Sequence, residues 1–349
     1  MHNGLIFQDE KFKKVIASKD KTDYKVVYRN QLVISFPIDE GVLASQRITD
    51  AGIVSPAYGI WDIDQIQILP EFLEYALRSN RAIQYYKAKL RGSTARRRSL
   101  PTPTLLAFMI PLPSIEEQKK ILKNMHKIRT IIRKRETQLN LMNDLIKARF
   151  VEMFGDITIN DRGWDSQPLG ELCTIVRGGS PRPIEKYLGG DVPWIKIGDA
   201  TEGEDIYLNS TKEHIIQEGV KKSRLVKKGS LIFANCGVSL GFARIITFDG
   251  CIHDGWLALE NIDKRLDKVF LLQALNQMTD HFRSIAPSGT QPNLNTAIMK
   301  AYKQIIPPLE MQSSFISFIT QIDKSKSVVQ KALDETQLLF DSLMQQYFG

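Results

Sequence analysis

The sequence repeats itself with a displacement of 194 residues, from "PSIEEQ" (113–118) to "PPLEMQ" (307–312). Without a gap, the same displacement places the Phe-Gly pair at 154–155 on the Phe-Gly pair at 348–349. An ungapped match of this length is typical of a helix, because an insertion would rotate one face away from its partner. A repeat of about 190 residues is far longer than a solenoid unit, so it predicts two homologous domains.

The correspondence continues upstream, where the displacement drifts by a few residues, as loops allow. The first copy has no counterpart of residues 167 to about 199, a segment that opens with "QPLGELCTIVRGGSPRP". We therefore expect a first domain that lacks its opening segment. The matched segments are "FLEYAL" (72–77) with "FLLQAL" (270–275), "VVYRNQLVIS" (26–35) with "LVKKGSLIFA" (225–234), "IVSPAYGIW" (53–61) with "CIHDGWLAL" (251–259), and "GST" (92–94) with "GT" after Ser288.

Each copy closes on a long stretch without proline or glycine, in which apolar residues recur at steps of four and three. This is the heptad pattern of a coiled coil. The first stretch is rich in Lys and Arg and the second in Asp and Glu, so charge favours their pairing. The chain crosses a whole domain between them, which makes an antiparallel pair the simplest closure. The predicted interface consists of Ile121, Met125, Ile128, Ile132, Leu139, Met142 and Ile146 with Phe315, Ile319, Ile322, Val329, Leu333, Phe340 and Leu343.

One alternative and a boundary complete this prediction. A single wide-striped helix packed on a globular body would also show such a pattern. Gly155 fits a helix-terminating glycine after the first stretch.

Strand-like "VPWIKIGD" (192–199) and "SLIFANCGV" (230–238) precede a helix-like segment at 267–286, so the fold class is α/β (α+β) with mixed strands. The expected divisions are a first domain at 1–112, a helix at 113–155, a second domain at 156–306 and a helix at 307–349.

Composition restricts the class of protein further. An apolar fraction of 43% and a charged fraction of 25% are ordinary for a globular chain. No apolar run has the length of a membrane span, and the N-terminus has no secretory signal pattern. The odd set of Cys173, Cys236 and Cys251 favours a reducing cytoplasm over a disulfide framework. A net charge of +8 indicates a polyanionic partner, although a solvated basic surface would explain it equally well.

Three loops carry side chains suited to DNA, although each could also be a plain surface turn. In "VRGGSPRP" (176–183) glycines allow close backbone approach and arginines suit phosphates or guanine edges. The segment "PSGTQPNLN" (287–295) offers hydroxyls and amides that read base edges, and its counterpart "RGSTARRRSL" (91–100) suits the phosphate backbone. The candidate DNA-binding residues are Arg91, Ser93, Thr94, Arg96, Arg97, Arg98, Arg177, Ser180, Arg182, Lys196, Thr290, Gln291 and Asn293.

The motifs of catalysis are missing from the sequence. There is no G-x-x-x-x-G-K-[ST] loop and no Asx-Pro-Pro-aromatic motif of an amino-methyltransferase. "CIHD" (251–254) has potential metal ligands, but the first copy has "IVSP" there, so the ligands do not belong to the repeated unit. We therefore expect no catalytic residue, no metal site and no cofactor bound by this chain.

These features together resemble the specificity (S) subunit of type I restriction–modification enzymes. The resemblance rests on two variable domains, one opening near "LGELCTIVRGG", and on "IPLPSIEEQKKI" and "IIPPLEMQ", each followed by a long helix. It implies two target recognition domains that each read half of a bipartite DNA sequence, with helices that fix the spacing. It implies partners as well: modification (methyltransferase) subunits with S-adenosylmethionine, and a restriction subunit with ATP and Mg. The chain itself would be a non-catalytic subunit of a restriction endonuclease and adenine methyltransferase.

The sequence differs from the family at the start of the first copy, where the opening segment has no counterpart. This difference keeps a second interpretation open. A truncated specificity protein would act mainly as a coiled-coil interaction partner or be a recombination remnant. It would have at most one functional half-site reader. A stand-alone nuclease or methyltransferase is disfavoured by the missing motifs.

Overall fold

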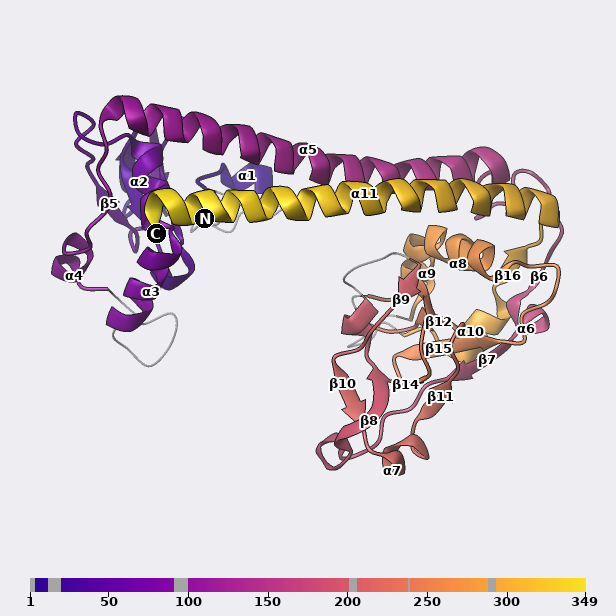
Figure 1. The fold of residues 1–349 in the computed structure, drawn as a ribbon. Coiled ribbons are helices and arrows are strands. Elements are labelled where there is room, and N and C mark those ends of the chain that lie inside the picture. Colours follow the sequence, from indigo (N-terminus) through magenta and orange to yellow (C-terminus); the bar gives the residue numbers. More distant parts are fainter. Residues whose placement is uncertain (1–3, 12–19, 91–99, 201–205, 238, 288–292) are drawn as a thin grey trace. The chain divides into compact units, whose positions relative to one another are not determined.

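A computed structural model describes residues 4–11, 20–90, 100–200, 206–237, 239–287 and 293–349 of the chain (Figure 1). The chain forms two compact units. Unit 1 comprises Met1–Leu139 and Val328–Gly349, and unit 2 comprises Asn140–Ser327. Each long helix therefore contributes one part to each unit. Among the described residues, no helix is both long enough and apolar enough to cross a membrane.

Unit 1 combines two small antiparallel sheets with short helices. Strand β1 pairs with β4, and a second sheet has the order β3-β2-β5. Pro70 opens helix α2 with its fixed φ, and the Ser79 side chain accepts a hydrogen bond from Ala82 N at the start of α3. The elements are α1 (Gln8–Lys11), β1 (Lys25–Tyr28), β2 (Leu32–Ile34), η1 (Ile38–Glu40), β3 (Leu43–Ser45), β4 (Ala51–Val54), β5 (Gly59–Trp61), α2 (Pro70–Leu77), α3 (Asn80–Lys89) and α4 (Thr102–Leu106).

Unit 2 contains larger sheets, with the orders β10-β8-β14-β11, β7-β15-β12-β13-β9 and β16-β6. The ladders β8·β14 and β9·β13 are parallel and the others antiparallel, so the strands are mixed as predicted. Its strands are β6 (Ser166–Pro168), β7 (Thr174–Arg177), β8 (Leu188–Ile195), β9 (Tyr207–Leu208), β10 (Glu213–Ile215), β11 (Arg224–Val226), β12 (Leu231–Ala234), β13 (Ala243–Ile246), β14 (Gly250–Ile252), β15 (Trp256–Glu260) and β16 (Lys303–Ile305). Its short helices are α6 (Leu169–Leu172), η3 (Ile184–Lys186), η4 (Ile197–Ala200), α7 (Gln217–Val220), α8 (Lys268–Gln277), α9 (Thr279–Ile285) and α10 (Thr296–Ala301).

The five-stranded sheet of unit 2 is buried on both faces. Phe233 and Leu257 pack into one core with Phe270 of α8, whereas their neighbours Ile232 and Ala258 pack into a separate core. Successive side chains of a strand point to opposite faces, which explains the alternation. Burial on both faces also explains why β12 consists of four consecutive apolar residues.

The helix predicted at 267–286 is interrupted in the structure. Helix α8 ends at Gln277 and α9 begins at Thr279. Thr279 donates its hydroxyl hydrogen to Gly241 O at 2.5 Å, and Arg283 Nε donates to Leu240 O at 3.1 Å. These bonds to the turn before β13 redirect the second half of the segment, a tertiary effect that the apolar period does not report.

The two long helices, α5 (Ile115–Phe154) and α11 (Leu309–Phe348), have 40 residues each. At 1.5 Å per residue, each is about 60 Å long. None of the predicted interface residues on either helix is exposed. Arg129 and Arg149 of α5 lie over aromatic rings of α11, at 5.9 Å from the centre of Phe340 and 5.8 Å from that of Phe318.

The pairing is antiparallel in both units. In unit 1, Phe348 at the end of α11 packs with Met125, near the start of α5, and with Phe72 at a ring distance of 4.9 Å. In unit 2, Phe154 at the end of α5 packs with Phe315, near the start of α11, and with Phe270, also at 4.9 Å. The Phe348–Phe72 and Phe154–Phe270 contacts occupy corresponding positions of the repeat, so the two units share one packing scheme.

Helix α5 ends as the sequence indicates. Gly155 has a φ of +77° and its N–H donates to Val151 O at 2.8 Å. A side chain there would also collide with Asp161, because a Cβ would lie 2.0 Å from Asp161 Oδ1. A glycine in the left-handed region therefore terminates the helix and lets the chain turn toward β6.

Candidate nucleic-acid interface

The predicted DNA-binding residues that the structure describes all belong to unit 2. Arg177 ends β7, Ser180 and Arg182 follow in the loop before η3, Lys196 follows β8, and Asn293 precedes α10. These assignments stay predictions, since their role depends on a ligand. The residues outside the described ranges are Arg91, Ser93, Thr94, Arg96, Arg97, Arg98, Thr290 and Gln291.

The three polar residues of the β7–η3 loop converge on Asp254, in the turn between β14 and β15. Ser180 donates its hydroxyl hydrogen to Asp254 Oδ1 at 2.8 Å, and Arg177 Nε donates to the Asp254 carbonyl oxygen at 3.0 Å. The Arg182 guanidinium lies 3.5 Å from Asp254 Oδ2, and its side chain is 81% exposed. Asp254 therefore fixes the loop while Arg182 remains accessible to a ligand.

His253 completes the network around this carboxylate. Its Nδ1 accepts a hydrogen bond from Gly255 N at 2.9 Å, so its Nε2, 2.9 Å from Asp254 Oδ1, carries the proton. Burial lowers the pKa of His253 despite the neighbouring carboxylate. Burial would raise the pKa of Asp254, but the Ser180 hydrogen bond and nearby positive charges outweigh it and hold that pKa below its usual value.

The glycines of this region serve close packing within the protein. A Cβ on Gly178 would lie 2.1 Å from the carbonyl oxygen of His253, and one on Gly255 would lie 3.0 Å from Cys236 Sγ. The sequence suggested that the loop glycines allow the backbone to approach a ligand. The structure shows that Gly178 approaches the protein's own β14–β15 turn.

Asn293 is held beside the same end of the five-stranded sheet. The buried Asn235, which follows β12, donates from Nδ2 to Asn293 Oδ1 and to Leu294 O, both at 3.1 Å. Asn293 also forms an antiparallel bridge with Cys236. Burial raises the pKa of the Cys236 thiol, and the Asp254 charge adds to this rise. The 176–183 loop and Asn293 are therefore held at the same end of this sheet.

Lys196 is engaged by the protein. Its ammonium group pairs with Glu213 and lies 5.2 Å from the centre of the Trp194 ring. Trp194 in turn packs against His253, with ring centres 5.6 Å apart. Lys196 is thus linked to the Asp254 network through Trp194, and its charge is largely compensated.

Sequence reasoning did not assign a role to Asp254, His253 or Asn235. The motif "CIHD" drew attention to His253 and Asp254 as potential metal ligands, an interpretation that the sequence disfavoured. Among the described residues, no group of three His, Cys, Asp or Glu side chains is arranged to hold a metal ion. Asn235 had one signal: it is the polar residue that ends a fully buried apolar strand.

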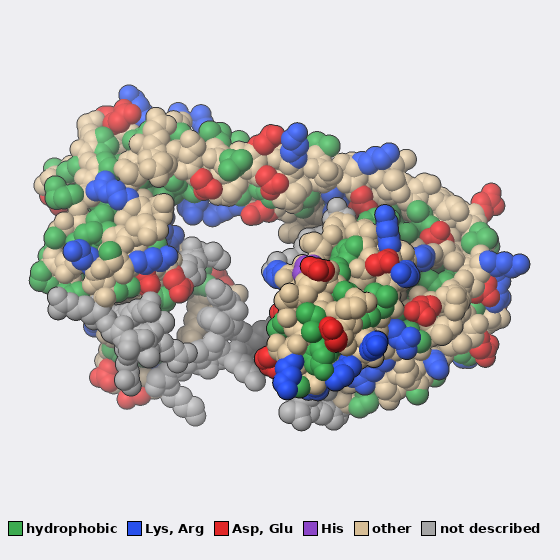
Figure 2. Space-filling model, turned by 60° about the horizontal axis from the view of Figure 1, so that its bottom comes forward, with side chains coloured by type: hydrophobic (Ala, Val, Ile, Leu, Met, Phe, Trp, Pro, Cys, Tyr) green, Lys and Arg blue, Asp and Glu red, His purple; other side chains and the backbone are tan. Residues whose placement is uncertain are grey.

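Charge is distributed rather than concentrated. On the face drawn in Figure 2, Lys and Arg side chains are interspersed with Asp and Glu side chains. The positive net charge does not form one continuous patch on that face. Within the network around Asp254, Arg182 has the most exposed charged side chain, at 81%.

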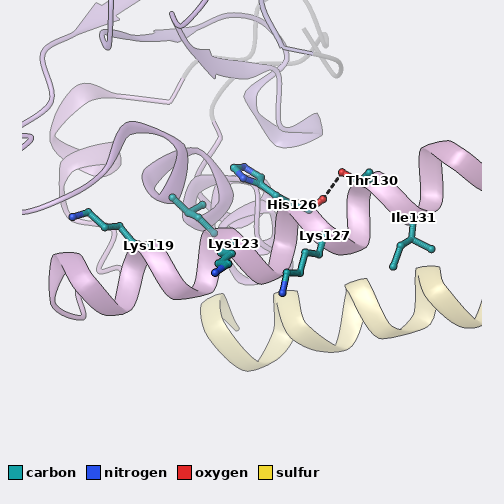
Figure 3. A pocket seen from close by; sticks show the side chains of 7 residues that line it. Lys119, Lys123, His126, Lys127, Thr130 and Ile131 are labelled. Carbon is teal, nitrogen blue, oxygen red and sulfur yellow. Dashed lines mark hydrogen bonds between the residues drawn. The ribbon is translucent and has the colours of Figure 1, made fainter.

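A second surface lies on α5 in unit 1. A shallow groove of about 660 Å³ runs along one face of the helix (Figure 3). Leu122, 8% exposed, contributes apolar surface, and Thr130 donates its hydroxyl hydrogen to His126 O at 2.8 Å. Lysines recur at every fourth position, so the rim is basic and the floor apolar. The lining residues are Lys119, Leu122, Lys123, His126, Lys127, Thr130 and Ile131.

The fold defines a class of protein with homologous mixed α/β domains and an antiparallel coiled coil built from two long helices. Residues 161–336, half of the chain, match the family model described as the type I restriction modification DNA specificity domain. The chain belongs to this family. The resemblance and the fold class predicted from the sequence are therefore confirmed.

Individual relatives agree with this assignment. The chain is 22% identical over 185 residues to the type I restriction enzyme MjaIX specificity subunit of Methanocaldococcus jannaschii, covering 51% of this chain and 43% of that protein. It is 22% identical over 289 residues to the putative MjaX specificity subunit of the same organism, covering 76% and 66%. It is 26% identical over 182 residues to the HindI specificity subunit of Haemophilus influenzae, covering 50% and 39%. The matches thus span less than two thirds of each relative.

Solved structures show the same fold. One, from work on complex assembly and conformational transition of the type I R-M system, has a TM-score of 0.63 at 18% identity, covering 95% of this chain and 84% of that one. The type I restriction-modification system S subunit from M. genitalium has a TM-score of 0.51 at 16% identity, covering 99% and 92%. At such identities the likeness concerns the fold alone.

Proposed function

We propose that this chain is the DNA sequence-recognition subunit of a type I restriction–modification complex. Unit 2 would read one half of a bipartite target through the loops at 176–183 and 287–295. The observation that carries the proposal is that Asp254 holds the 176–183 loop, and Asn235 holds Asn293, at the same end of one sheet. Guanidinium and amide groups placed together are the side chains that read base edges and phosphates.

The chain would contribute recognition and leave chemistry to its partners. Ser180 donates to Asp254 Oδ1 at 2.8 Å, and His253 Nε2 lies 2.9 Å from the same oxygen, an arrangement that differs from a serine nucleophile bonded to a histidine base. Modification subunits would bring S-adenosylmethionine, and a restriction subunit would bring ATP and Mg. The assembly would act on DNA in the cytoplasm.

The long helices would hold the modification subunits. The buried face of each long helix packs against the other long helix, which leaves the outward faces for partners. The groove on α5, with its lysine rim and apolar floor, suits a helix that carries acidic and apolar residues (Figure 3). The Lys123→Glu, Lys127→Glu double variant should weaken capture of the modification subunit, whereas Lys134→Glu, on the same helix outside the groove, is the matched control.

The experiment that tests the proposal is a comparison of methylated motifs in the host genome with and without this gene. Deletion should remove one bipartite motif. Complementation with the Arg177→Ala, Arg182→Ala double variant should relax one half of the motif, and Lys264→Ala, which removes an exposed charge elsewhere in unit 2, should restore it. Unchanged methylation after deletion, in cells that retain the modification subunits, would refute the proposal.

A second candidate function is that of an interaction protein with at most one reading unit. It is favoured by one difference between the units: β7, which leads into the loop of Arg177 and Arg182, has no counterpart among the described residues of unit 1. On this reading, only one half-site of the motif would be specified. The same methylation experiment distinguishes the two, because a full reader specifies bases on both sides of the gap.

A further inference from the structure

The sheets of the two units correspond strand by strand. In unit 1, β1 pairs with β4 so that Val26 lies opposite Ile53. In unit 2, β11 pairs with β14 so that the aligned residues Leu225 and Cys251 lie opposite each other. The order β3-β2-β5 likewise corresponds to β13-β12-β15. The repeat is therefore preserved in register as well as in sequence.

The correspondence ends at the outer edges of two strands. In unit 2, the second edge of β14 is paired in parallel with β8, which places Trp194 beside Cys251. The second edge of β15 is paired as well, in antiparallel orientation, with β7. Among the described residues of unit 1, β4 pairs only with β1, and β5 pairs only with β2. The corresponding edges of β4 and β5 are thus open in the described part of unit 1.

Burial follows this difference. Strands β14 and β15 are buried along almost their whole length, whereas β4 and β5 have no buried residue. Cys251 is 0% exposed, whereas its counterpart Ile53 is 52% exposed. The outer strands, β1 of unit 1 and β11 of unit 2, have the same burial pattern at their aligned residues and serve as an internal comparison. Ile53 is therefore exposed at the edge of β4 that corresponds to the edge of β14 covered by β8 in unit 2.

We infer that the edge of β4 is a strand-accepting site that binds a β-strand from a second polypeptide. An unpaired strand edge presents N–H and C=O groups that a further strand can satisfy. Unit 2 shows what fits such an edge: β8 runs parallel to β14 and places an aromatic side chain over the residue equivalent to Ile53. The occupant is the opening strand of another specificity-type domain, supplied in trans, with a large apolar residue opposite Ile53. Charge at that position would be excluded, because it would be buried without a partner.

The proposal can be tested on the full chain with a labelled peptide of residues 186–197, "KYLGGDVPWIKI". Fluorescence anisotropy should show saturable binding, and hydrogen exchange should slow at the amides of 52–54. Ile53→Asp should weaken the binding by about tenfold or more, because it buries a charge under the added strand. Ile66→Asp, at a side chain that is 88% exposed, should leave the affinity unchanged. A peptide with Trp194→Asp should bind as poorly as the wild-type peptide binds the Ile53→Asp chain.

Three outcomes would overturn the proposal, and none depends on DNA binding. One is a dissociation constant weaker than about 1 mM for the peptide. Another is binding that persists in Ile53→Asp while thermal melting shows both variants folded. A third is protection at residues 250–252 instead of 52–54, which would mean that the peptide displaces β8 from unit 2.

Discussion

Gln118 and Gln312 lie at corresponding positions of the two long helices and make the same three hydrogen bonds. Both side chains are fully buried. Gln118 Oε1 accepts from Leu69 N at 2.8 Å, and its Nε2 donates to the carbonyl oxygens of Gln67 and Pro113, both at 2.9 Å. The amide thus joins the first turn of α5 to the segment that precedes α2.

The second amide does the same for α11. Gln312 Oε1 accepts from Asp267 N at 2.8 Å, and its Nε2 donates to Arg265 O at 2.8 Å and Pro307 O at 2.7 Å. A buried amide with every bond satisfied fixes a geometry more specifically than apolar packing does. Each glutamine therefore sets the direction in which its helix leaves its domain.

Removal of one amide should destabilise the unit that contains it. In Gln312→Leu, one buried and two partly buried hydrogen bonds to the backbone are lost, which should cost about 2–4 kcal/mol of unfolding free energy in unit 2. Urea unfolding followed by tryptophan fluorescence would measure this cost, because Trp194 and Trp256 are buried in unit 2. Gln321→Ala, at an exposed position of the same helix, should change it little. Equal stability of Gln312→Leu and wild type would show that the amide has no anchoring role.

The terminal aromatic residues should act on the opposite unit from the one in which their helix begins. Phe348→Ala removes a side chain that is 1% exposed and packs on Phe72, and it should cost unit 1 about 3–5 kcal/mol. Phe154→Ala should affect unit 2 in the same way. Hydrogen exchange resolved by segment would assign the loss to one unit. Val151→Ala, at a side chain that is 52% exposed, is the control, and a loss spread evenly over both units would contradict this packing scheme.

Arg182 should contribute to DNA binding through charge. If it contacts a phosphate, Arg182→Ala should weaken binding to all sequences alike and reduce the salt slope of the binding constant by about 1. Asn293→Ala, if it reads a base, should cost about 1–3 kcal/mol on the specific target only. Titrations at several salt concentrations would separate the two, with Lys264→Ala as the charge-matched control. A salt slope that Arg182→Ala leaves unchanged would remove Arg182 from the phosphate contacts.

Acid should loosen the β7–η3 loop. The folded-state pKa of His253 lies below its ordinary value of 6.5, so protonation favours the unfolded state and stability falls as pH drops below 6.5. The pKa of Asp254 is also lowered, so its contribution is present at neutral pH and is lost at more acidic pH, as the carboxylate protonates. Melting temperatures between pH 7 and pH 5 would show the first effect. His253→Asn should reduce the change in melting temperature over this pH interval. An unaltered change would exclude His253 as its origin.

The sequence by itself determined the features that are local or periodic. A displacement of 194 residues predicted the duplicated architecture, and the steps of four and three predicted which side chains of α5 and α11 are removed from solvent. Such patterns can be recognised in a sequence because a helix repeats its geometry at every turn. The steps of four and three did not include Phe150 and Phe154, which are nearly fully buried, since their burial depends on contacts with the rest of unit 2.

Only the tertiary structure decided how distant segments meet. Asp254 and Ser180 are 74 residues apart in the chain, and Asn235 and Asn293 are 58 apart, yet each pair is hydrogen-bonded. Aligned residues also received different surroundings, since Cys251 is covered by β8 and Ile53 has no such cover among the described residues. A residue's identity fixes its local preferences, whereas its burial and its hydrogen-bond partners depend on which strand lies alongside it.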